Sequence, residues 1–169
     1  MLIRPETPAD FPAIYDFVKT AFATADRCDG DEQDYVNKLR ASDRYLPQLA
    51  LVAEENGILI GHIMLTAMSI IAGNTTYTQL LLSPLCVALS HRKTGVGSQL
   101  VTESFRLARP MDYQAVFLVG NPAYYSRFGF RPVADFGIVN NSTIPDPYVM
   151  GCELVPNGLQ GQQGSIQIV

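Results

Sequence analysis

The sequence predicts an α+β fold in which helices cover both faces of a central mixed, mostly antiparallel sheet. Two segments, near residues 11–22 and 96–108, place apolar residues at helical spacing, whereas residues 49–70 form two apolar runs joined by Asn-Gly. These elements form a meander flanked by helices rather than a regular alternation of strand and helix. With 169 residues, of which 47% are hydrophobic and 17% charged, the chain is expected to form a single domain over residues 1–169.

The N-terminal segment predicts a short strand followed by two helices. LIRPETP indicates a strand and a proline-marked turn, and we expect Asp10, which precedes Pro12, to be the N-cap of the first helix. One face of this helix is apolar and consists of Phe11, Ile14, Phe17, Val18 and Phe22. DEQDYVNKLRASDRY predicts a second helix, with acidic residues in its first turn, where the helix dipole favours negative charge.

Strand signals dominate the middle of the chain after Pro47. LALVAEENGILIGHIMLTAMSI contains two β-favouring runs joined at Asn56-Gly57, which predicts a hairpin. NTTYTQLLLSPLCVAL predicts a third strand. Pro84 inside this strand cannot donate a ladder hydrogen bond, so we expect the sheet to be splayed there, with the strand parting from a neighbour.

A helix, a strand and a short helix are predicted next. GVGSQLVTESFRLA predicts a helix that Pro110 ends, with one apolar side made of Val96, Leu100, Val101, Phe105 and Ala108. QAVFLVG predicts a buried strand. In NPAYYSRFGF, Asn121 as N-cap, Pro122 at the first position and Gly129 after the last turn define a short helix. The Gly- and Gln-rich tail predicts either an edge strand or a mobile end.

Composition excludes several classes of protein. The formal net charge of −4 argues against a nucleic-acid-binding protein, which usually carries a basic patch. The most apolar run, residues 58–72, is shorter than the roughly 20 residues of a membrane span, and the polar N-terminal residues do not form a secretory leader. We therefore expect a cytoplasmic protein that binds neither nucleic acid nor membrane. Cys28, Cys86 and Cys152 are far apart, so we expect neither a disulfide framework nor a metal site.

The segment SHRKTGVGSQL, between the third strand and the next helix, has the layout of an anion-binding helix N-terminus. The first amides of a helix lack partners within the helix, and the helix dipole adds partial positive charge there. Gly95 and Gly97 carry no Cβ, so an anion can approach these amides closely. Side chains of the same segment add charge and hydroxyl donors: Arg92, Lys93, Thr94 and Ser98. Together these features suit a phosphate or a pyrophosphate.

The common nucleotide motifs do not fit this turn. A P-loop requires Gly-Lys followed by Ser or Thr, and a Rossmann fingerprint requires a third glycine where Leu100 stands. If the preceding strand parts at Pro84, the backbone groups of Leu85, Cys86 and Val87 can pair with amides of a ligand. A ligand with amides behind a pyrophosphate matches this order, and coenzyme A, whose pantetheine arm has two amides, is such a ligand.

Two segments, LSPLCVALSHRKTGVGSQLV and NPAYYSRFGF, resemble the GCN5-related N-acetyltransferases, the GNAT superfamily. Arg92, Gly95 and Gly97 match the family's acetyl-CoA pyrophosphate motif of Gln or Arg, two spacers, Gly, one spacer, and Gly or Ala. The opening IRPETPADFPAI, the Asn-Gly hairpin and the Tyr-x-x-x-Gly-Phe ending follow in the family's order, so the resemblance covers most of the chain. It is strongest to a bacterial subgroup of predicted N-acetyltransferases that carry PAYYSRFGF.

The resemblance implies the GNAT fold and an acetyl-CoA-dependent N-acetyltransferase. Such an enzyme transfers an acetyl group to a primary amine of a small molecule or a protein by direct attack. Leu85 and Val87, on either side of Cys86, would hold the acetyl carbonyl and the pantetheine through their backbone groups. The amides of residues 92–98, including that of Val96, would cradle the pyrophosphate.

Tyr125 is the candidate catalytic residue. The resemblance places it where the family's tyrosine protonates the departing CoA thiolate, and a phenol with a pKa near 10 can donate to a thiolate. Tyr124 points about 100° away on the same short helix, so only one of the two is expected to face the cofactor. The register with Gly129-Phe130 favours Tyr125. Asn121 is a candidate cofactor contact, although the family often places that asparagine earlier in the chain.

The residues do not identify a general base. Glu54 and Glu55 lie at the hairpin turn, and His62 fits a packing position in a strand. His91 lies in the glycine turn, so deprotonation through water and arrival of a neutral amine both remain open. The acidic segment ATADRCDGDEQD borders the acceptor side in the family's fold, and we expect it to favour a cationic amine.

Two other interpretations remain open. A non-catalytic acyl-CoA-binding or sensing module would keep the glycine turn but would have no use for Tyr125. A nucleotide-binding regulator would use the same helix end, although the P-loop and Rossmann patterns are missing from the sequence.

Addition of residues 166–169 to the sheet of a second copy would make a homodimer.

Overall fold

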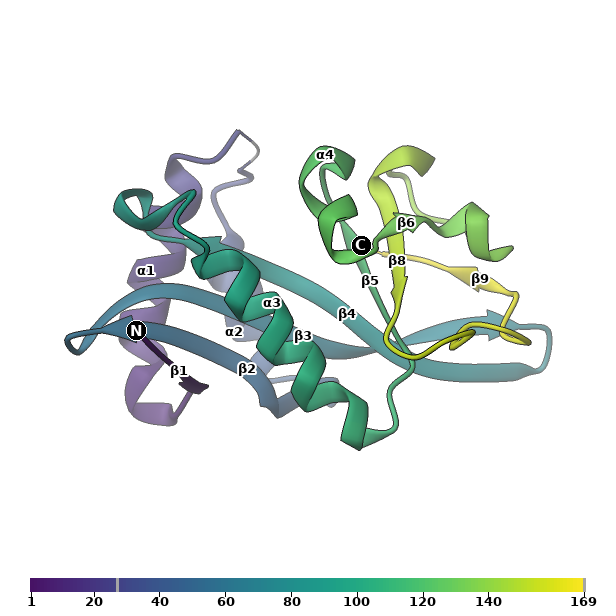
Figure 1. Ribbon diagram of the computed structural model, residues 1–169, viewed down its shortest axis with the longest axis horizontal. Coiled ribbons are helices and arrows are strands. Elements are labelled where there is room, and N and C mark those ends of the chain that lie inside the picture. Colours follow the sequence, from purple (N-terminus) through teal and green to yellow (C-terminus); the bar gives the residue numbers. More distant parts are fainter. Residues whose placement is uncertain (27, 169) are drawn as a thin grey trace. The chain divides into compact units, whose positions relative to one another are not determined.

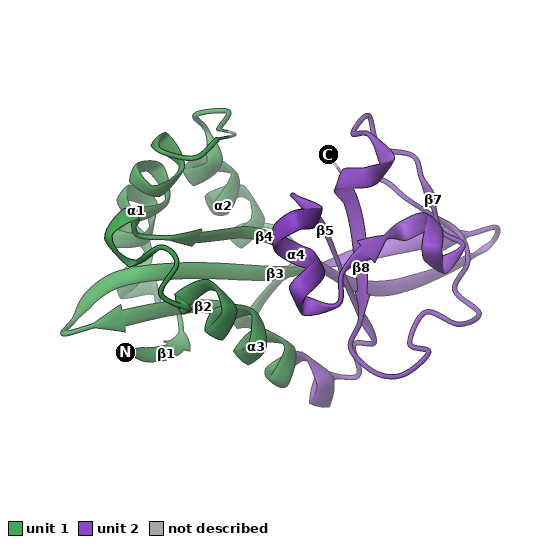
Figure 2. Ribbon diagram, turned by 45° about the horizontal axis from the view of Figure 1, so that its top comes forward, with its two compact units in different colours: residues 1–66, 83–107 green, residues 67–82, 108–169 purple. Residues whose placement is uncertain are grey.

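The computed structural model describes residues 1–26 and 28–168, which form two compact units. Figure 2 shows unit 1, made of residues 1–66 and 83–107, and unit 2, made of residues 67–82 and 108–169. Two long strands, β3 (Ile58–Ala72) and β4 (Thr75–Val87), contribute to both units. The mixed α+β architecture with a mostly antiparallel sheet agrees with the sequence prediction.

The sheet of unit 1 is antiparallel and contains the predicted hairpin. β1 (Leu2–Pro5) pairs with β2 (Tyr45–Glu55), which in turn pairs with β3. Asn56 and Gly57, between β2 and β3, have φ angles of 51° and 77°. Positive φ at both central residues is the geometry that favours Asn-Gly in tight hairpins. The amide of Ala88, which follows β4, donates to the carbonyl of Ile60 in β3 at 2.9 Å.

Helices cover both faces of this sheet, as Figure 1 shows. The helices are α1 (Phe11–Ala23), α2 (Glu32–Arg40) and α3 (Val96–Ala108). Met64 of β3 packs in one apolar cluster with residues of α1 and α2. Gly61 faces α3, because a Cβ at this position would lie 2.8 Å from Leu100 and 3.0 Å from Val96. Residues 61 and 64 differ by an odd number, so their side chains point to opposite faces of the strand.

Asp10 stands at the N-cap position of α1, as the sequence predicted. Its carboxylate, however, makes no capping hydrogen bond to that helix. It accepts hydrogen bonds from the amide and hydroxyl of Thr7, at 2.8 and 2.9 Å, and it pairs with Arg4. The ion pair explains this choice, because Arg4 holds the carboxylate toward the preceding short turn. The second helix is also shorter than predicted and ends at Arg40.

Unit 2 contains the parallel pair and the small C-terminal strands. β4 pairs in parallel with β5 (Ala115–Val119) through Leu80 and Leu81, and this register ends before Pro84. β5 pairs antiparallel with β8 (Val149–Glu153), which also pairs with β6 (Arg131–Pro132). The short helix α4 (Pro122–Tyr125) follows β5. An apolar cluster from these strands, which includes Phe117 and Val149, forms the core of the unit.

The Gly- and Gln-rich tail ends in a strand of the chain's own sheet. β9 (Ser165–Ile166) pairs with β3 through Ile71 and with β7 (Val139–Asn140). Residues 165 and 166 therefore have strand neighbours on both sides within this chain. The sequence assigned residues 166–169 to a dimer contact, and residue 169 lies outside the described residues.

The buried carboxylate of Glu6, which follows β1, joins three further elements of unit 1. Arg40, at the end of α2, donates to it at 2.8 and 3.0 Å, and the hydroxyl of Tyr45 in β2 donates at 2.8 Å. The Nε2 atom of His62 in β3 lies 3.0 Å from Oε2. Burial alone raises the pKa of Glu6, but hydrogen bonds from His62 and Arg40 outweigh it and lower the pKa to about 2.

We predict that Glu6→Gln lowers the free energy of unfolding at pH 7 by about 3 kcal/mol, because it leaves a buried guanidinium without its charge partner. The pKa of Glu6 is lower in the folded state than its ordinary value of 4.5. Its contribution is therefore full above pH 4.5 and is lost as the pH falls toward 2. Urea unfolding from pH 7 to pH 3 measures both effects, and the variant should show less loss of stability than the wild type over this range.

The control is Glu103→Gln, which removes a carboxylate paired with Arg106 on the exposed side of α3. Such exposed pairs contribute little, so its unfolding midpoint should stay close to that of the wild type. Equal midpoints for Glu6→Gln and Glu103→Gln would contradict the role of Glu6.

Candidate functional site

The glycine turn of unit 1 leads into the helix N-terminus that the sequence predicted. α3 begins at Val96, and the amide of Gln99 donates to the carbonyl of Gly95 at 3.0 Å. Lys93 and Gly95 both have left-handed φ angles, of 62° and 94°. A Cβ at Gly95 would meet no heavy atom within 4 Å, so the turn is open on that side. The first amides of α3 therefore follow a turn whose backbone a ligand can approach.

The other residues of the turn differ in their exposure. Thr94 is exposed, and its hydroxyl donates to the carbonyl of His91. Ser98 is half-buried, whereas Gly97 in the first turn of α3 is buried.

Arg92 donates its hydrogen bonds to protein groups. Its guanidinium donates to the carbonyls of Ala21, Thr24 and Val87, at 2.7, 3.3 and 3.2 Å, and to the hydroxyl of Thr24 at 2.9 Å. Ala21 and Thr24 lie at the C-terminal end of α1, where helix carbonyls lack partners and a positive charge is favourable. The sequence suggested that Arg92 adds charge beside a pyrophosphate. The structure shows a second role, in which Arg92 ties the end of α1 to the end of β4.

The end of β4 lines a pocket of about 200 Å³ in unit 1. The lining residues are Ala21, Phe22, Ala25, Leu85, Cys86, Val87 and Arg92. Cys86 is buried, and burial raises the pKa of its thiol to about 12. With this pKa, the thiol of Cys86 is protonated at neutral pH. The thiolate is the nucleophilic form, so Cys86 behaves as an apolar side chain there. This protonation state argues against an acyl-carrying role for Cys86.

In unit 2, α4 has the N-cap that the sequence predicted, because Asn121 accepts a hydrogen bond from the amide of Ala123 at 2.9 Å. Gly129, with a φ angle of 92°, caps the 3-10 turn Ser126–Phe128 that follows α4, and α4 itself ends at Tyr125. The ring of Tyr125 lies against Gly120, where any Cβ would clash with it. It also makes an edge contact with the ring of Phe130, whose centroid is 5.8 Å away. The side-chain oxygen of Asn121, which is a candidate cofactor contact, already accepts the capping hydrogen bond from Ala123.

Tyr124 and Tyr125 have different surroundings, as their spacing on the helix predicted. Their rings meet edge to face, with centroids 4.9 Å apart and planes 88° apart. The guanidinium of Arg127 lies over the ring of Tyr124 at 4.5 Å, and Phe128 contacts the same ring. Burial raises the pKa of Tyr124. The two phenols are thus distinct groups, which makes them a matched pair for substitution.

The residues weighed as general bases all have partners. Glu54 accepts from Arg4 at 3.1 Å, and Glu55 lies 3.2 Å from the Nε2 atom of His91. His62 is buried against Glu6, as a packing histidine would be. Two ways to obtain a neutral amine therefore stay open: deprotonation through water, and arrival of the amine in its neutral form.

The acidic segment between α1 and α2 divides into two groups. Glu32 accepts from the amides of Asp29 and Gly30, at 2.6 and 3.1 Å, and so stabilises its own turn. Asp34 accepts from the hydroxyl of Tyr15 at 3.0 Å. The side chains of Asp29 and Asp31 are exposed and remain the candidates for attraction of a cationic acceptor. Arg27, in the same segment, lies outside the described residues.

Within residues 1–26 and 28–168, no group of three or more His, Cys, Asp or Glu side chains is arranged to hold a metal ion. Among the helices that the structure describes, none has the length and apolar character needed to cross a membrane.

Known proteins match this chain in sequence. Residues 2–133 match the family model of the acetyltransferase (GNAT) domain. YhbS, an uncharacterised N-acetyltransferase of Escherichia coli K12, is 31% identical over 134 residues, which are 79% of this chain and 75% of YhbS. YjhQ, another uncharacterised N-acetyltransferase of the same organism, is 32% identical over 117 residues, which are 69% of this chain. That match spans only 62% of the length of YjhQ.

Solved structures match the fold. The crystal structure of YhbS from Escherichia coli in complex with CoA has a TM-score of 0.85 and 27% identity, and the match covers 99% of this chain and 89% of that one. A GNAT family acetyltransferase from Brucella melitensis, in complex with acetyl-CoA, has a TM-score of 0.68 and 30% identity. That match covers 77% of this chain and 82% of the other.

We predict that Arg92→Gln destabilises the protein by about 2 kcal/mol, because it removes charge-assisted hydrogen bonds to the end of α1. Lys93→Gln is the matched control, since it removes the same charge from the neighbouring, exposed residue. Thermal unfolding should show a lower midpoint for Arg92→Gln and little change for Lys93→Gln. Equal shifts in the two variants would mean that the charge of the turn matters and the contacts of Arg92 do not.

Proposed function

The chain belongs to the GNAT acetyltransferase family, and we propose that it transfers an acetyl group from acetyl-CoA to a primary amine. The observation that carries this proposal is the open glycine turn at the N-terminus of α3, directly after β4. The CoA and acetyl-CoA complexes of the two related structures support it. We propose residues 1–169 as a single acetyltransferase domain that needs no metal.

The proposed cofactor site uses mainly backbone groups. The amides of residues 92–98 bind the pyrophosphate, aided by the exposed side chains of Lys93 and Thr94. The positive φ angles at Lys93 and Gly95 and the free space at Gly95 support this part of the proposal. The backbone groups of Leu85 and Val87 hold the acetyl carbonyl and the pantetheine. Arg92 takes part through its amide, while its side chain fixes the turn to α1.

The proposed reaction is a direct attack. The amine nitrogen forms a bond to the thioester carbonyl carbon, and the carbon–sulfur bond then breaks. A backbone amide near Val87 donates to the tetrahedral oxyanion, which needs a fixed donor. The amine loses its proton to water or arrives neutral, and Tyr125 donates a proton to the departing CoA thiolate. Asn121 caps α4 and so positions the helix that carries Tyr125.

We propose a cationic amine as the acceptor before deprotonation, on a small molecule or a protein. The exposed carboxylates of Asp29 and Asp31 support a preference for positive charge. A cytoplasmic location also belongs to the proposal. We also propose a homodimer. The exposed apolar side chains of Ile71 and Val139 support it, and they lie on the two strands that flank β9. A non-catalytic acyl-CoA sensor is the second candidate, and the substitutions of the tyrosines below distinguish it.

We predict that acetyl-CoA and CoA bind the wild type in a calorimetric titration and that ATP binds far more weakly. Gly97→Glu should abolish binding, because it places a carboxylate and extra volume at the anion site. Because Gly97 is buried, its substitution can also affect folding, so Thr94→Glu makes a similar change at an exposed position. This variant should bind acetyl-CoA at least about tenfold more weakly than the wild type. Thr102→Glu makes the same change on the exposed side of α3 and should bind like the wild type. Absence of binding by either CoA species to the wild type would refute the proposed function.

We predict that Tyr125→Phe lowers kcat about 10²-fold, the smaller end of general acid catalysis, and leaves the affinity for acetyl-CoA unchanged. The rate of thiol release, with an amine found in a library screen, measures kcat. The fall in kcat of Tyr125→Phe should be smaller when the acetyl donor is a thioester of a thiol that leaves more easily than CoA. Tyr124→Phe is the matched control and should keep its kcat. Wild-type rates in both variants would remove Tyr125 from the mechanism, and a wild type that binds acetyl-CoA but transfers to no amine would favour the sensor.

A further inference from the structure

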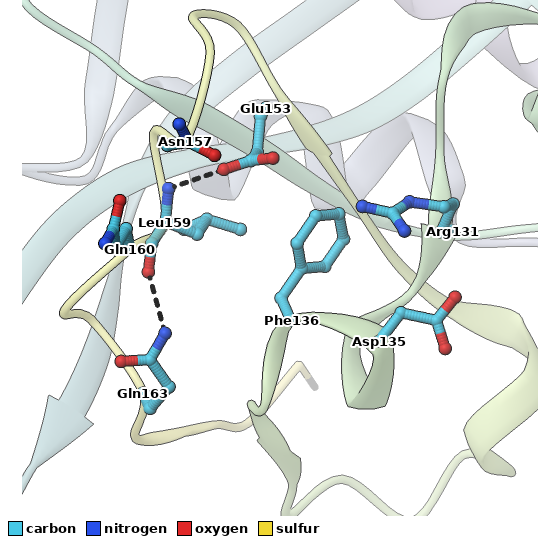
Figure 3. Close-up of a pocket in the computed structure, with 8 residues that line it drawn as sticks. All are labelled: Arg131, Asp135, Phe136, Glu153, Asn157, Leu159, Gln160 and Gln163. Atoms are coloured by element: carbon cyan, nitrogen blue, oxygen red, sulfur yellow. Dashed lines mark hydrogen bonds between the residues drawn. The ribbon is translucent and has the colours of Figure 1, made fainter.

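Unit 2 contains an open pocket of about 530 Å³ (Figure 3). Its lining residues are Arg131, Asp135, Phe136, Glu153, Asn157, Leu159, Gln160 and Gln163. They come from β6, the short turn after it, the end of β8 and the Gly- and Gln-rich tail. The volume falls in the range of roughly 300–1,000 Å³ that is usual for small-molecule sites. No residue of the proposed acetyl-CoA site lines this pocket.

The tail forms a fixed wall of this pocket. Glu153 accepts from the amide of Leu159 at 2.9 Å, and the side chain of Gln163 donates to its carbonyl at 3.2 Å, as Figure 3 shows. Leu159 itself is buried. The neighbouring Gln162 points inward, where it donates to the side chain of Gln114 at 2.8 Å and accepts from Gln79 at 3.0 Å. The pocket is therefore built before any ligand arrives.

The chemistry of the lining excludes several ligand classes. Six of the eight side chains are planar and polar: Arg131, Asp135, Glu153, Asn157, Gln160 and Gln163. In the described part of the chain, the side chains of Asp135, Asn157 and Gln160 make no hydrogen bond to protein groups. Two carboxylates against one guanidinium disfavour an anion such as a phosphate. An apolar ligand would bury the polar groups without partners, which is costly.

One aromatic ring stands among these polar groups. Phe136 is half-buried, and in Figure 3 it lies between the tail residues and Arg131. The guanidinium of Arg131 lies over this ring, with its carbon atom 4.5 Å from the centroid. The ring thus offers an apolar contact surface that is held in place, surrounded by both donors and acceptors.

We propose that this pocket binds a small hydroxylated ligand of the sugar class and prefers one that carries an amino group. Vicinal hydroxyls donate to carboxylates and accept from amide and guanidinium groups, so planar polar side chains can bind them in pairs. The carbon–hydrogen face of a sugar ring packs against Phe136. An ammonium group pairs with Asp135 or with the free oxygen of Glu153. This site is independent of acetyl transfer.

Titration of the full chain, followed by amide NMR, tests the proposal with three probes: D-glucosamine, D-glucose and putrescine. Both sugars should shift the amides of the tail and the side-chain amides of Asn157 and Gln160, and glucosamine should bind more tightly. Putrescine carries ammonium groups without hydroxyls and should bind more weakly than either sugar. Absence of sugar binding at millimolar concentrations, or putrescine binding as tight as that of glucosamine, would overturn the proposal.

Two substitutions at exposed positions localise the site without loss of the fold. Asp135→Asn should weaken glucosamine about fivefold and leave glucose unchanged, because it removes charge and keeps the shape. Gln160→Ala should weaken both sugars. Gln167→Ala, at an exposed glutamine outside the pocket, is the matched control and should bind as the wild type does. If Gln167→Ala weakens binding as much as Gln160→Ala, the sugars bind elsewhere and the assignment is wrong.

Discussion

The buried carboxylate of Glu6 is the constraint on which unit 1 depends. A buried charge costs several kcal/mol unless charge and hydrogen bonds compensate it. Here the compensation comes from Arg40, Tyr45 and His62, so α2, β2 and β3 must all come together at the end of β1. The same stretch of β3 also determines where α3 lies, because Gly61, next to His62, leaves room on the opposite face. The carboxylate on one face and the glycine on the other thus place the helix that carries the candidate anion site.

The guanidinium of Arg92 connects the candidate anion site at the start of α3 to the end of α1, which lies on the opposite face of the sheet. Its four hydrogen bonds join the end of α1, the end of β4 and the glycine turn. A positive charge at this position also compensates the carbonyls at the end of α1. Any displacement of α1 would therefore act on the turn directly. Ala21, Val87 and Arg92 also line the small pocket beside Cys86, so the shape of this pocket depends on two of the same contacts.

The parts of the fold that were predictable carry local signals. Asn56-Gly57 requires positive φ, and Asn121, Pro122 and Gly129 each suit one position of a short helix, so neighbours in sequence determine them. The partners of Arg92, Asp10 and Glu6 were not predictable, because each was selected by geometry that only the folded sheet creates. The glycine turn itself was predictable as a helix start, whereas the use of the Arg92 guanidinium for α1 was not. No pattern within the sequence connects Glu6 to His62.

The tail shows why composition alone did not decide between order and mobility. Two of its glycines are needed for close packing, because a Cβ at Gly158 would clash with the carbonyl of Gln114 and one at Gly164 with that of Ile71. Its inward glutamine, Gln162, is neutral and has both a donor and an acceptor, so it can be buried without the cost of a charge. Its partner Gln79 accepts in turn from the amides of Gln114 and Ala115, at the start of β5. A segment of glycine and glutamine can thus be ordered when its inward-pointing amide has partners, and the glutamines that point outward are then free to line a site.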